Sequence, residues 1–325
     1  MAGLASADMR LQWREYSISG HGPGKPSADA APAQLVIDTD TDPRDLSFRP
    51  ATASANKALT DSQISFFNEN GFLSPLPALD VAEISEVKRY IDDLIRKVVD
   101  APDRRNAYSI FNYQIACRGM YEIIQSPMIL DYAEDLLGKN FVCWNTHLFC
   151  KAPNDPMQVP FHQDAVYWPL TPSRTVTVWL ALDDVDEENA AMQFAPGSHL
   201  LGPLVHEQKS LDGTRALKRE AVAPGSPGAY FTNALRAGDI SVHSDLLLHG
   251  SAANLSGRRR AGLTIRYAPA DVRPLPGAEW YVSSAVHCRG TIPGHWPNRR
   301  KPSSEHPELL SHLWGDFDGT PYSHD

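Results

Sequence analysis

The chain has 325 residues, 42% of them hydrophobic, and carries a formal net charge of -9 at pH 7. This length and apolar content suit one large domain or two small ones and exclude a globally disordered chain. The acidic balance argues against nucleic acid or an anionic membrane surface as the main partner, so we expect a small-molecule substrate and a monomer or homodimer.

The four cysteines predict a reducing environment. Cys117, Cys143, Cys150 and Cys288 form no C-x-x-C motif and no dense disulfide framework, which indicates buried free thiols. No basic segment followed by an apolar run marks a secretory signal, and no stretch approaches the about 18 apolar residues of a spanning helix. A cytoplasmic protein without membrane contact is the expectation.

The first 58 residues predict an N-terminal extension that is partly flexible. They are rich in Ala, Ser, Pro, Gly and Asp, and the run 20–32 is typical of flexible coil. Two alternatives stay open for this extension. It wraps around the domain or a second subunit, or it is a mobile tail.

Helical signals follow the extension. A capping box at 60–63 begins the first predicted helix, and Gly71 ends it. Asp80 caps the second, whose apolar residues then repeat at helical spacing up to position 98. The third opens at Ser126-Pro127 and ends at Gly138.

After position 139 the pattern changes to that of strands. Segments rich in β-branched and aromatic residues lie at 141–150, 175–182, 192–195, 239–243 and 262–268. Helices first and strands later favour an antiparallel β core with helices on one side. The polar, proline-containing tail from about Arg273 is predicted to cover this core without a fold of its own.

The tripeptide His162-Gln163-Asp164 is the first candidate metal motif. On a strand, the first and third side chains of such a triplet point to one face. His249, which is expected to end an apolar strand, can complete a 2-His-1-carboxylate triad suited to Fe(II). Arg260 follows eleven residues later and offers a planar fork for a carboxylate. A lone His-x-Asp is weak evidence, and the chain has a second one at 243–245.

The order of these pieces resembles the phytanoyl-CoA dioxygenase family of Fe(II)/2-oxoglutarate oxygenases. The similar segments are 59–72, 161–168, 177–182, 194–199, 249–260 and 263–267. The resemblance covers about residues 59–270. It implies a mainly β protein with flanking helices around a double-stranded β-helix core, also called a jelly roll or cupin-like fold. The domain would span 59–272, with a C-terminal extension, 273–325, packed on the core.

The resemblance also implies a set of site residues. Iron would be held by His162, Asp164 and His249, and 2-oxoglutarate by Arg260, with the hydroxyl of Ser251 as a further hydrogen-bonding group. Two more side chains, Asn145 and Trp179, are predicted to face the cosubstrate, with core packing as the alternative. His199, His243 and Asp245 are then expected to be structural or to lie behind the ligands.

The activity implied by the resemblance is that of a dioxygenase. It would consume 2-oxoglutarate and O2, release succinate and CO2, and hydroxylate an unactivated carbon. Halogenases of this mechanism replace the carboxylate ligand, so the presence of Asp164 favours hydroxylation or desaturation. The expected substrate is a small polar metabolite or a natural-product intermediate. Its candidate contacts are Tyr167, Trp168, Arg266, Tyr113 and Gln114.

Three other readings stay open. One is an acyl-CoA hydroxylase with the same mechanism. Another is a jelly-roll protein that binds metal without turnover. The third is a zinc hydrolase that uses the same three ligands, which leaves Arg260 unexplained.

Overall fold

The protein is described here from a computed structural model. It covers residues 43–52, 56–101, 106–107, 110–210, 213–222 and 230–314. The predicted coil at 20–32 lies outside these residues. No helix in the described part of the chain is long and apolar enough to cross a membrane.

The three predicted helices are confirmed, and a short fourth one lies between the second and the third. The helices are α1 (Asp61–Asn70), α2 (Val81–Val99), α3 (Arg118–Ile124) and α4 (Pro127–Leu137). Both predicted capping boxes form, at Thr60 and at Asp80. Gly71 ends α1 with a φ of 83°, a left-handed conformation that glycine adopts without strain.

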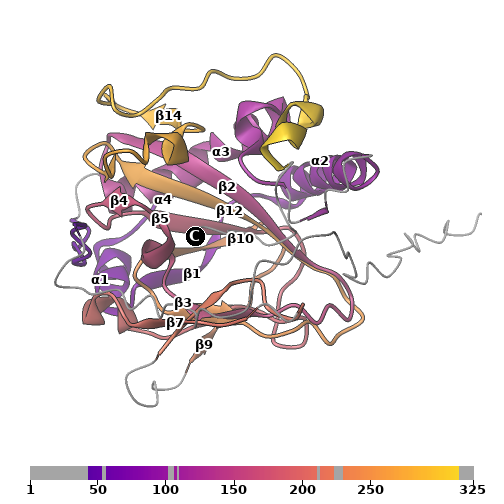
Figure 1. Ribbon diagram of the computed structural model, residues 1–325, viewed down its shortest axis with the longest axis horizontal. Helices are drawn as coiled ribbons and strands as arrows, with labels where there is room; N and C mark the ends of the chain where they lie inside the picture. The colour runs from indigo at the N-terminus through magenta and orange to yellow at the C-terminus, as the bar shows by residue number, and fades with distance from the viewer. Residues whose placement is uncertain are drawn as a thin grey trace, which may run out of the picture. The chain divides into compact units, whose positions relative to one another are not determined.

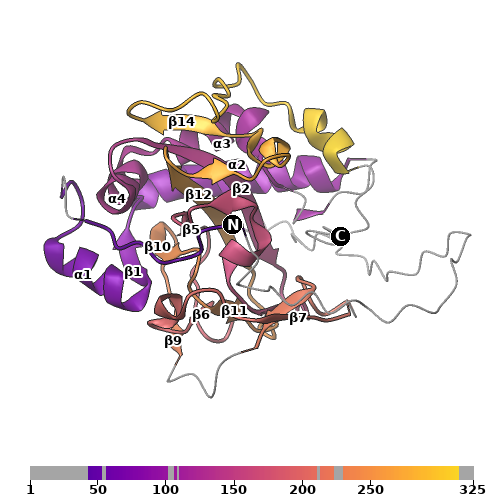
Figure 2. The ribbon, with the colours of Figure 1, turned by 60° about the vertical axis from the view of Figure 1, so that its left-hand side comes forward.

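Two antiparallel sheets build the core. The larger has the order β1 (Phe72–Pro77), β10 (Asp239–Ser244), β5 (Val176–Ala181), β12 (Arg260–Pro269), β2 (Phe141–Lys151) and β14 (Val286–Arg289). The smaller has the order β3 (Val159–His162), β11 (His249–Ser251), β6 (Gln193–Phe194) and β9 (Phe231–Thr232). Figures 1 and 2 show the smaller sheet on one side of the larger and α2, α3 and α4 on the other. This is the predicted jelly roll with flanking helices.

Shorter elements connect and extend the sheets. Two small ribbons pair β4 (Leu170–Thr171) with β13 (Arg273–Pro274), and β7 (His206–Gln208) with β8 (Arg219–Ala221). Single 3-10 turns are η2 (Tyr113–Ile115), η3 (Asp164–Tyr167), η4 (Ser198–Leu201), η5 (Glu279–Val282) and η6 (Pro307–Trp314).

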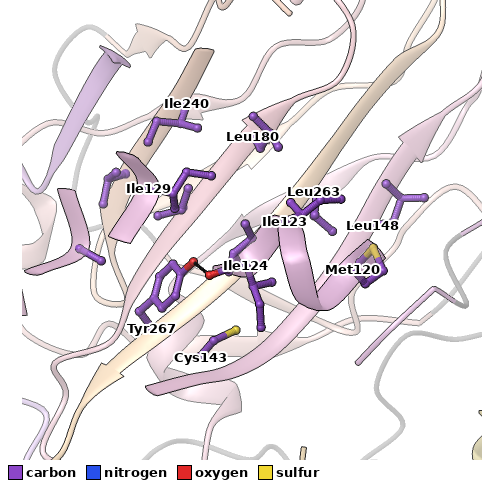
Figure 3. Close-up of a cluster of buried hydrophobic side chains, with 14 of the residues drawn as sticks. Met120, Ile123, Ile124, Ile129, Cys143, Leu148, Leu180, Ile240, Leu263 and Tyr267 are labelled. Carbon is purple, nitrogen blue, oxygen red and sulfur yellow. Dashed lines mark hydrogen bonds between the residues drawn. The ribbon is translucent and has the colours of Figure 1, made fainter. Parts of the chain in front are cut away.

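The two faces of strand β12 have different roles, one in the core that packs on the helices and one facing the smaller sheet. Its odd-numbered residues, Ala261, Leu263, Ile265 and Tyr267, are fully buried in the core shared with the helices. Figure 3 shows part of this core, where Leu263 and Tyr267 lie against α3 and the Tyr267 hydroxyl donates a 2.8 Å hydrogen bond to the Ile124 carbonyl. Since strand side chains alternate, the even-numbered residues of β12 point to the opposite face, toward the smaller sheet.

The tail from Arg273 adds a strand to the core sheet, which the sequence did not predict. β14 joins the large sheet at its edge by pairing with β2, and Val286 is fully buried opposite Cys143. A four-residue edge strand that is buried on one side leaves too short an apolar pattern to read from sequence.

The end of the predicted N-terminal extension lies against the domain. Arg44 donates hydrogen bonds to the carbonyls of Ala165 and Trp168, at 2.9 and 2.8 Å. Leu46 is buried beside Ala165 and Leu246. Within the described residues, this segment therefore braces the turn that follows His162.

Candidate metal centre

Neighbouring strands bring the three predicted ligands together. His249 on β11 lies opposite His162 on β3, and their ring centroids are 4.3 Å apart. The Nε2 atom of His162 is 3.5 Å from Oδ1 of Asp164. One ligand atom from each of the three residues lies within 4.8 Å of the others, and all three side chains are buried.

Two local predictions about these ligands are wrong. His162 and Asp164 were expected to share one strand face, but β3 ends at His162, and Asp164 is the first residue of η3. His249 was expected to end a strand, but it begins β11. Strand alternation was expected to place the two side chains side by side. The turn η3 does this instead, because it folds the carboxylate of Asp164 back beside the imidazole of His162. A Cβ at Gly250 would lie 2.8 Å from the Val159 carbonyl oxygen, so only glycine lets β11 approach β3 this closely.

Backbone carbonyls fix the tautomer of both histidines. Nδ1 of His162 lies 2.8 Å from the Pro160 carbonyl oxygen, and Nδ1 of His249 lies 2.9 Å from that of Leu247. A carbonyl oxygen only accepts, so each Nδ1 carries the proton and each Nε2 keeps its lone pair. Burial, together with His162 and His243, also lowers the pKa of His249 well below its usual value, which keeps this ring neutral.

The carboxylate is oriented from a third strand. Thr177 on β5 donates a 3.1 Å hydrogen bond from its hydroxyl to Oδ2 of Asp164. His243 on β10 places Nε2 3.8 Å from the same oxygen, closer than the sequence led us to expect. Burial alone would raise the pKa of Asp164, but His162, His243 and the charge of Arg266 hold it well below its usual range. Asp164 is therefore an anion.

The middle residue of the motif holds the turn in place. Gln163 is fully buried, and its amide donates to the carbonyls of Gly202 and Leu246 and accepts from the N–H of Leu204. Its own N–H donates to Nε2 of His206 at 3.2 Å. These bonds tie the turn between the two ligands to the segment 202–206 and to Leu246. No periodicity in the sequence marks Gln163 or His206 for this role.

A small cavity of about 40 Å³ opens beside Asp164 and His249. Its described lining residues are Phe149, Val159, Asp164, Thr177, Trp179, Met192, His243, His249, Gly250, Ser251, Arg260, Thr264 and Arg266. Thus the inner face of β12 supplies two arginines, and Asp164 is the one acid in this lining.

One end of the cavity is cationic. Arg260 is 1% exposed, and its guanidinium lies 5.0 Å from the ring of Trp179. Lys151, opposite Arg260 on β2, donates a 2.9 Å hydrogen bond to the hydroxyl of Ser251 and another to the Ala252 carbonyl. Nothing in the sequence pattern singles out Lys151. Lys151 only follows the predicted strand at 141–150, which is the one hint that it lies near Arg260.

The remaining predicted contacts lie at the other end or outside the cavity. Arg266 lines it, with its guanidinium 5.2 Å from the ring of Trp168, and donates a hydrogen bond to Asn145. Tyr167 lies beside His162, with ring centroids 5.8 Å apart. Trp168 itself is buried in an apolar cluster that is separate from the cavity lining.

Two predicted contacts are further away. Tyr113 is fully buried in the helix-side core. Gln114 is fully buried too, and it accepts a 2.6 Å hydrogen bond from the Thr146 hydroxyl. Neither residue belongs to the described lining of the cavity, so any contact with substrate stays a prediction.

Comparisons with known proteins agree with this architecture. The family model described as phytanoyl-CoA dioxygenase (PhyH) matches residues 67–262. The human peroxisomal phytanoyl-CoA dioxygenase is 25% identical over 288 residues, covering 81% of this chain and 84% of the human protein. A probable alpha-ketoglutarate-dependent hypophosphite dioxygenase from Stutzerimonas stutzeri is 32% identical over 180 residues. The alignment covers 52% of this chain and 61% of that relative. Among solved structures, the non-heme monooxygenase ThoJ in its apo form aligns with a TM-score of 0.66 and 29% identity, covering 77% of this chain and 92% of ThoJ.

Proposed function

Since the chain belongs to the phytanoyl-CoA dioxygenase family, whose model matches residues 67–262, we propose that it hydroxylates an unactivated carbon of a small polar metabolite or natural-product intermediate. The enzyme is an Fe(II)/2-oxoglutarate-dependent dioxygenase that uses O2 and releases succinate and CO2. The observation that carries the proposal is the cluster of His162, Asp164 and His249 beside a buried arginine.

The donor set fits Fe(II). Three ligands on one face of an octahedron, each about 2.1 Å from the metal, lie about 3 Å apart, close to the 3.5 Å between Nε2 of His162 and Oδ1 of Asp164. Two neutral imidazoles with free Nε2 lone pairs and one carboxylate are the 2-His-1-carboxylate set of such oxygenases. Bound there, the iron would supply O2 activation and leave positions for the cosubstrate.

The other residues hold and shield the reactants. Arg260 would bind the distal carboxylate of 2-oxoglutarate with its planar fork, backed by the ring of Trp179. The Ser251 hydroxyl, which accepts from Lys151, still has a proton to donate to the same carboxylate. Phe149 and Met192 in the lining exclude water from the reacting atoms.

The size of the cavity favours a small substrate over an acyl-CoA thioester. At about 40 Å³ it is far smaller than typical ligand pockets, and the cosubstrate would occupy this space first. The acyl-CoA alternative therefore requires the nucleotide to lie outside this cavity. Tyr167, Trp168, Tyr113 and Gln114 stay proposed substrate contacts.

The assay for this function is succinate formation. The purified chain with Fe(II), 2-oxoglutarate and O2 should release succinate slowly by itself and faster with its substrate, whose product gains one oxygen atom. His249→Ala should abolish both, whereas the exposed Arg258→Gln should leave both unchanged. A chain that binds Fe(II) and 2-oxoglutarate yet forms no succinate would be a binding protein, and hydrolysis without O2 would favour the zinc reading.

Several coarser features belong to the same proposal. We expect a cytoplasmic enzyme that acts as a monomer or homodimer, with no nucleic-acid or membrane partner. We also expect domain limits at 59 and 272, with residues 273–325 as an extension packed on the core. Light scattering of the full chain and limited proteolysis would test the oligomeric state and these limits.

A further inference from the structure

The end of the cavity that faces away from Arg260 contains a second buried guanidinium. Arg266 is 4% exposed and lies on the same face of β12 as Arg260, with Gly262 and Thr264 between them. Six residues of strand separate the two Cα atoms by about 20 Å. Arg266 lies opposite Thr177 on β5, and the Thr177 hydroxyl donates a hydrogen bond to Oδ2 of Asp164. Arg266 therefore lies on the metal side of the cavity.

Within the described residues, the hydrogen-bond and ring contacts of this guanidinium are to neutral groups. One face lies 5.2 Å from the ring of Trp168, and Nη1 donates to the side-chain oxygen of Asn145. Nε has no hydrogen-bond partner in the described part of the chain, and no carboxylate there forms an ion pair with Arg266. A buried cation without a counterion is costly, so such a group usually serves a ligand.

Asn145 is itself fixed, which keeps its oxygen directed at the arginine. Its amide nitrogen donates a 3.0 Å hydrogen bond to the side-chain oxygen of Asn112. The Asn112 oxygen also accepts from the N–H of Thr146, at 3.3 Å. All of these groups are uncharged, so the network orients Arg266 without neutralising it.

With Fe(II) and 2-oxoglutarate bound, the charges around the cavity would sum to one uncompensated positive charge. The two charges of Fe(II) and the two of 2-oxoglutarate cancel. Asp164 offsets one of the two arginines that line the cavity, and the other is left without compensation. Lys151 adds little, because burial and the neighbouring Arg260 lower its pKa to about 6.

We propose that the substrate carries an oxyanion, a carboxylate or a phosphonate, which pairs with Arg266 and so holds the reacting carbon near the metal. This inference rests on the proposed function and specifies the substrate class of the same site. A guanidinium fork with a free Nε–H suits two parallel hydrogen bonds to either anion. The flat ring of Trp168 limits the fork to one plane.

The test measures binding to the full chain loaded with Fe(II) and saturating 2-oxoglutarate without O2, so that Arg260 is already occupied. The probes are butyrate and phenylacetate, each with its primary amide, together with methylphosphonate and phenylphosphonate. At least one anion should bind about tenfold or more tightly than its neutral counterpart, as expected for charged hydrogen bonds. Comparing the carboxylates with the phosphonates identifies which oxyanion is preferred.

Two variants challenge Arg266 from opposite directions. Arg266→Gln should reduce the preference for the anion to about twofold or less, since the charge is gone. Asn145→Asp should do the same while keeping the arginine, because it supplies an internal counterion; this variant also covers the case in which Arg266→Gln does not fold. Arg258→Gln removes the same charge from the exposed surface and should change nothing.

Three results would overturn the inference. The first is an anion preference that survives in Arg266→Gln, and the second is equal or absent binding of acids and amides in the wild type. The third is a loss of 2-oxoglutarate affinity in Arg266→Gln as large as the loss for the probe anions, which would make the residue a cosubstrate ligand. Succinate formation without added substrate reports separately on the proposed function. If that activity is present while acid binding fails, only the substrate class is wrong.

Discussion

Replacing Gly262 by alanine should weaken the binding of 2-oxoglutarate without touching a charged group. A Cβ at this position would lie 1.9 Å from Cζ2 of Trp179, whereas ordinary contact begins at 3.4 Å, so the indole must move by about 1.5 Å. Trp179 is 1% exposed and has no open space to enter except the cavity. Its displacement also removes the flat support of Arg260, 5.0 Å away.

The magnitude follows from these two effects. Overpacking a buried site costs about 1–3 kcal/mol, which in a chain of this size lowers the melting temperature by about 1.5–4.5 °C. Loss of the Arg260–Trp179 contact costs about 0.5–2 kcal/mol, and at about 1.4 kcal/mol per tenfold the Kd of 2-oxoglutarate should rise about 2- to 30-fold. Thermal unfolding of the metal-free chain and calorimetric titration of 2-oxoglutarate measure the two separately.

A double-mutant cycle supplies the control. Trp179→Phe removes the indole atoms that Cβ would meet, so Gly262→Ala should cost about 1 kcal/mol less in that background. Additive effects, or an unchanged Kd in Gly262→Ala, would show that the indole does not transmit the clash to Arg260.

Three further predictions concern stability, pH and metal affinity. Burial lowers the pKa of His206 to about 4 from its usual 6.5, so between these pH values the unfolded chain binds more protons than the folded one. The free energy of unfolding should therefore fall by about 3 kcal/mol as pH drops from about 6.5 to 4. In urea unfolding at several pH values, His206→Gln should lack this part of the pH dependence. Asp183→Asn should cost about 2–4 kcal/mol in the same assay, because the carboxylate is 12% exposed and pairs with a half-buried arginine, whereas the matched change at the exposed Asp186 should cost under about 1 kcal/mol. Thr177→Val should weaken Co(II) binding about tenfold by calorimetry, since it removes the hydrogen bond that orients Asp164, and unchanged affinity would mean that the hydroxyl has no such role.

The sequence predicted best those features that depend only on residues close to one another in the chain. The capping boxes at Thr60 and Asp80 satisfy helix-end N–H groups within four residues, so they could be read without the fold. The strand at 262–268 could be predicted for the same reason, because β-branched and aromatic residues favour strands locally. The close approach of β11 to β3 could be read from Gly250.

The backbone conformation that positions the metal ligands could mostly not be predicted from the sequence. Asp164 follows its strand on a 3-10 turn, and that turn is held by Gln163, whose partners Gly202, Leu204 and Leu246 are 39–83 residues away. No local pattern encodes hydrogen bonds of that range. The same holds for Lys151, whose contact with Ser251 crosses 100 residues.

Thus the sequence by itself determined the types of ligand, the class of fold and the elements that carry them. Which side chains face one another was decided only by the tertiary structure. The pairing of β12 with β2 sets Lys151 beside Arg260 and Asn145 beside Arg266, at opposite ends of one strand. The physical reason is that burial and charge balance depend on neighbours brought together by sheet pairing, and an arginine in a sequence does not show whether a carboxylate lies near it.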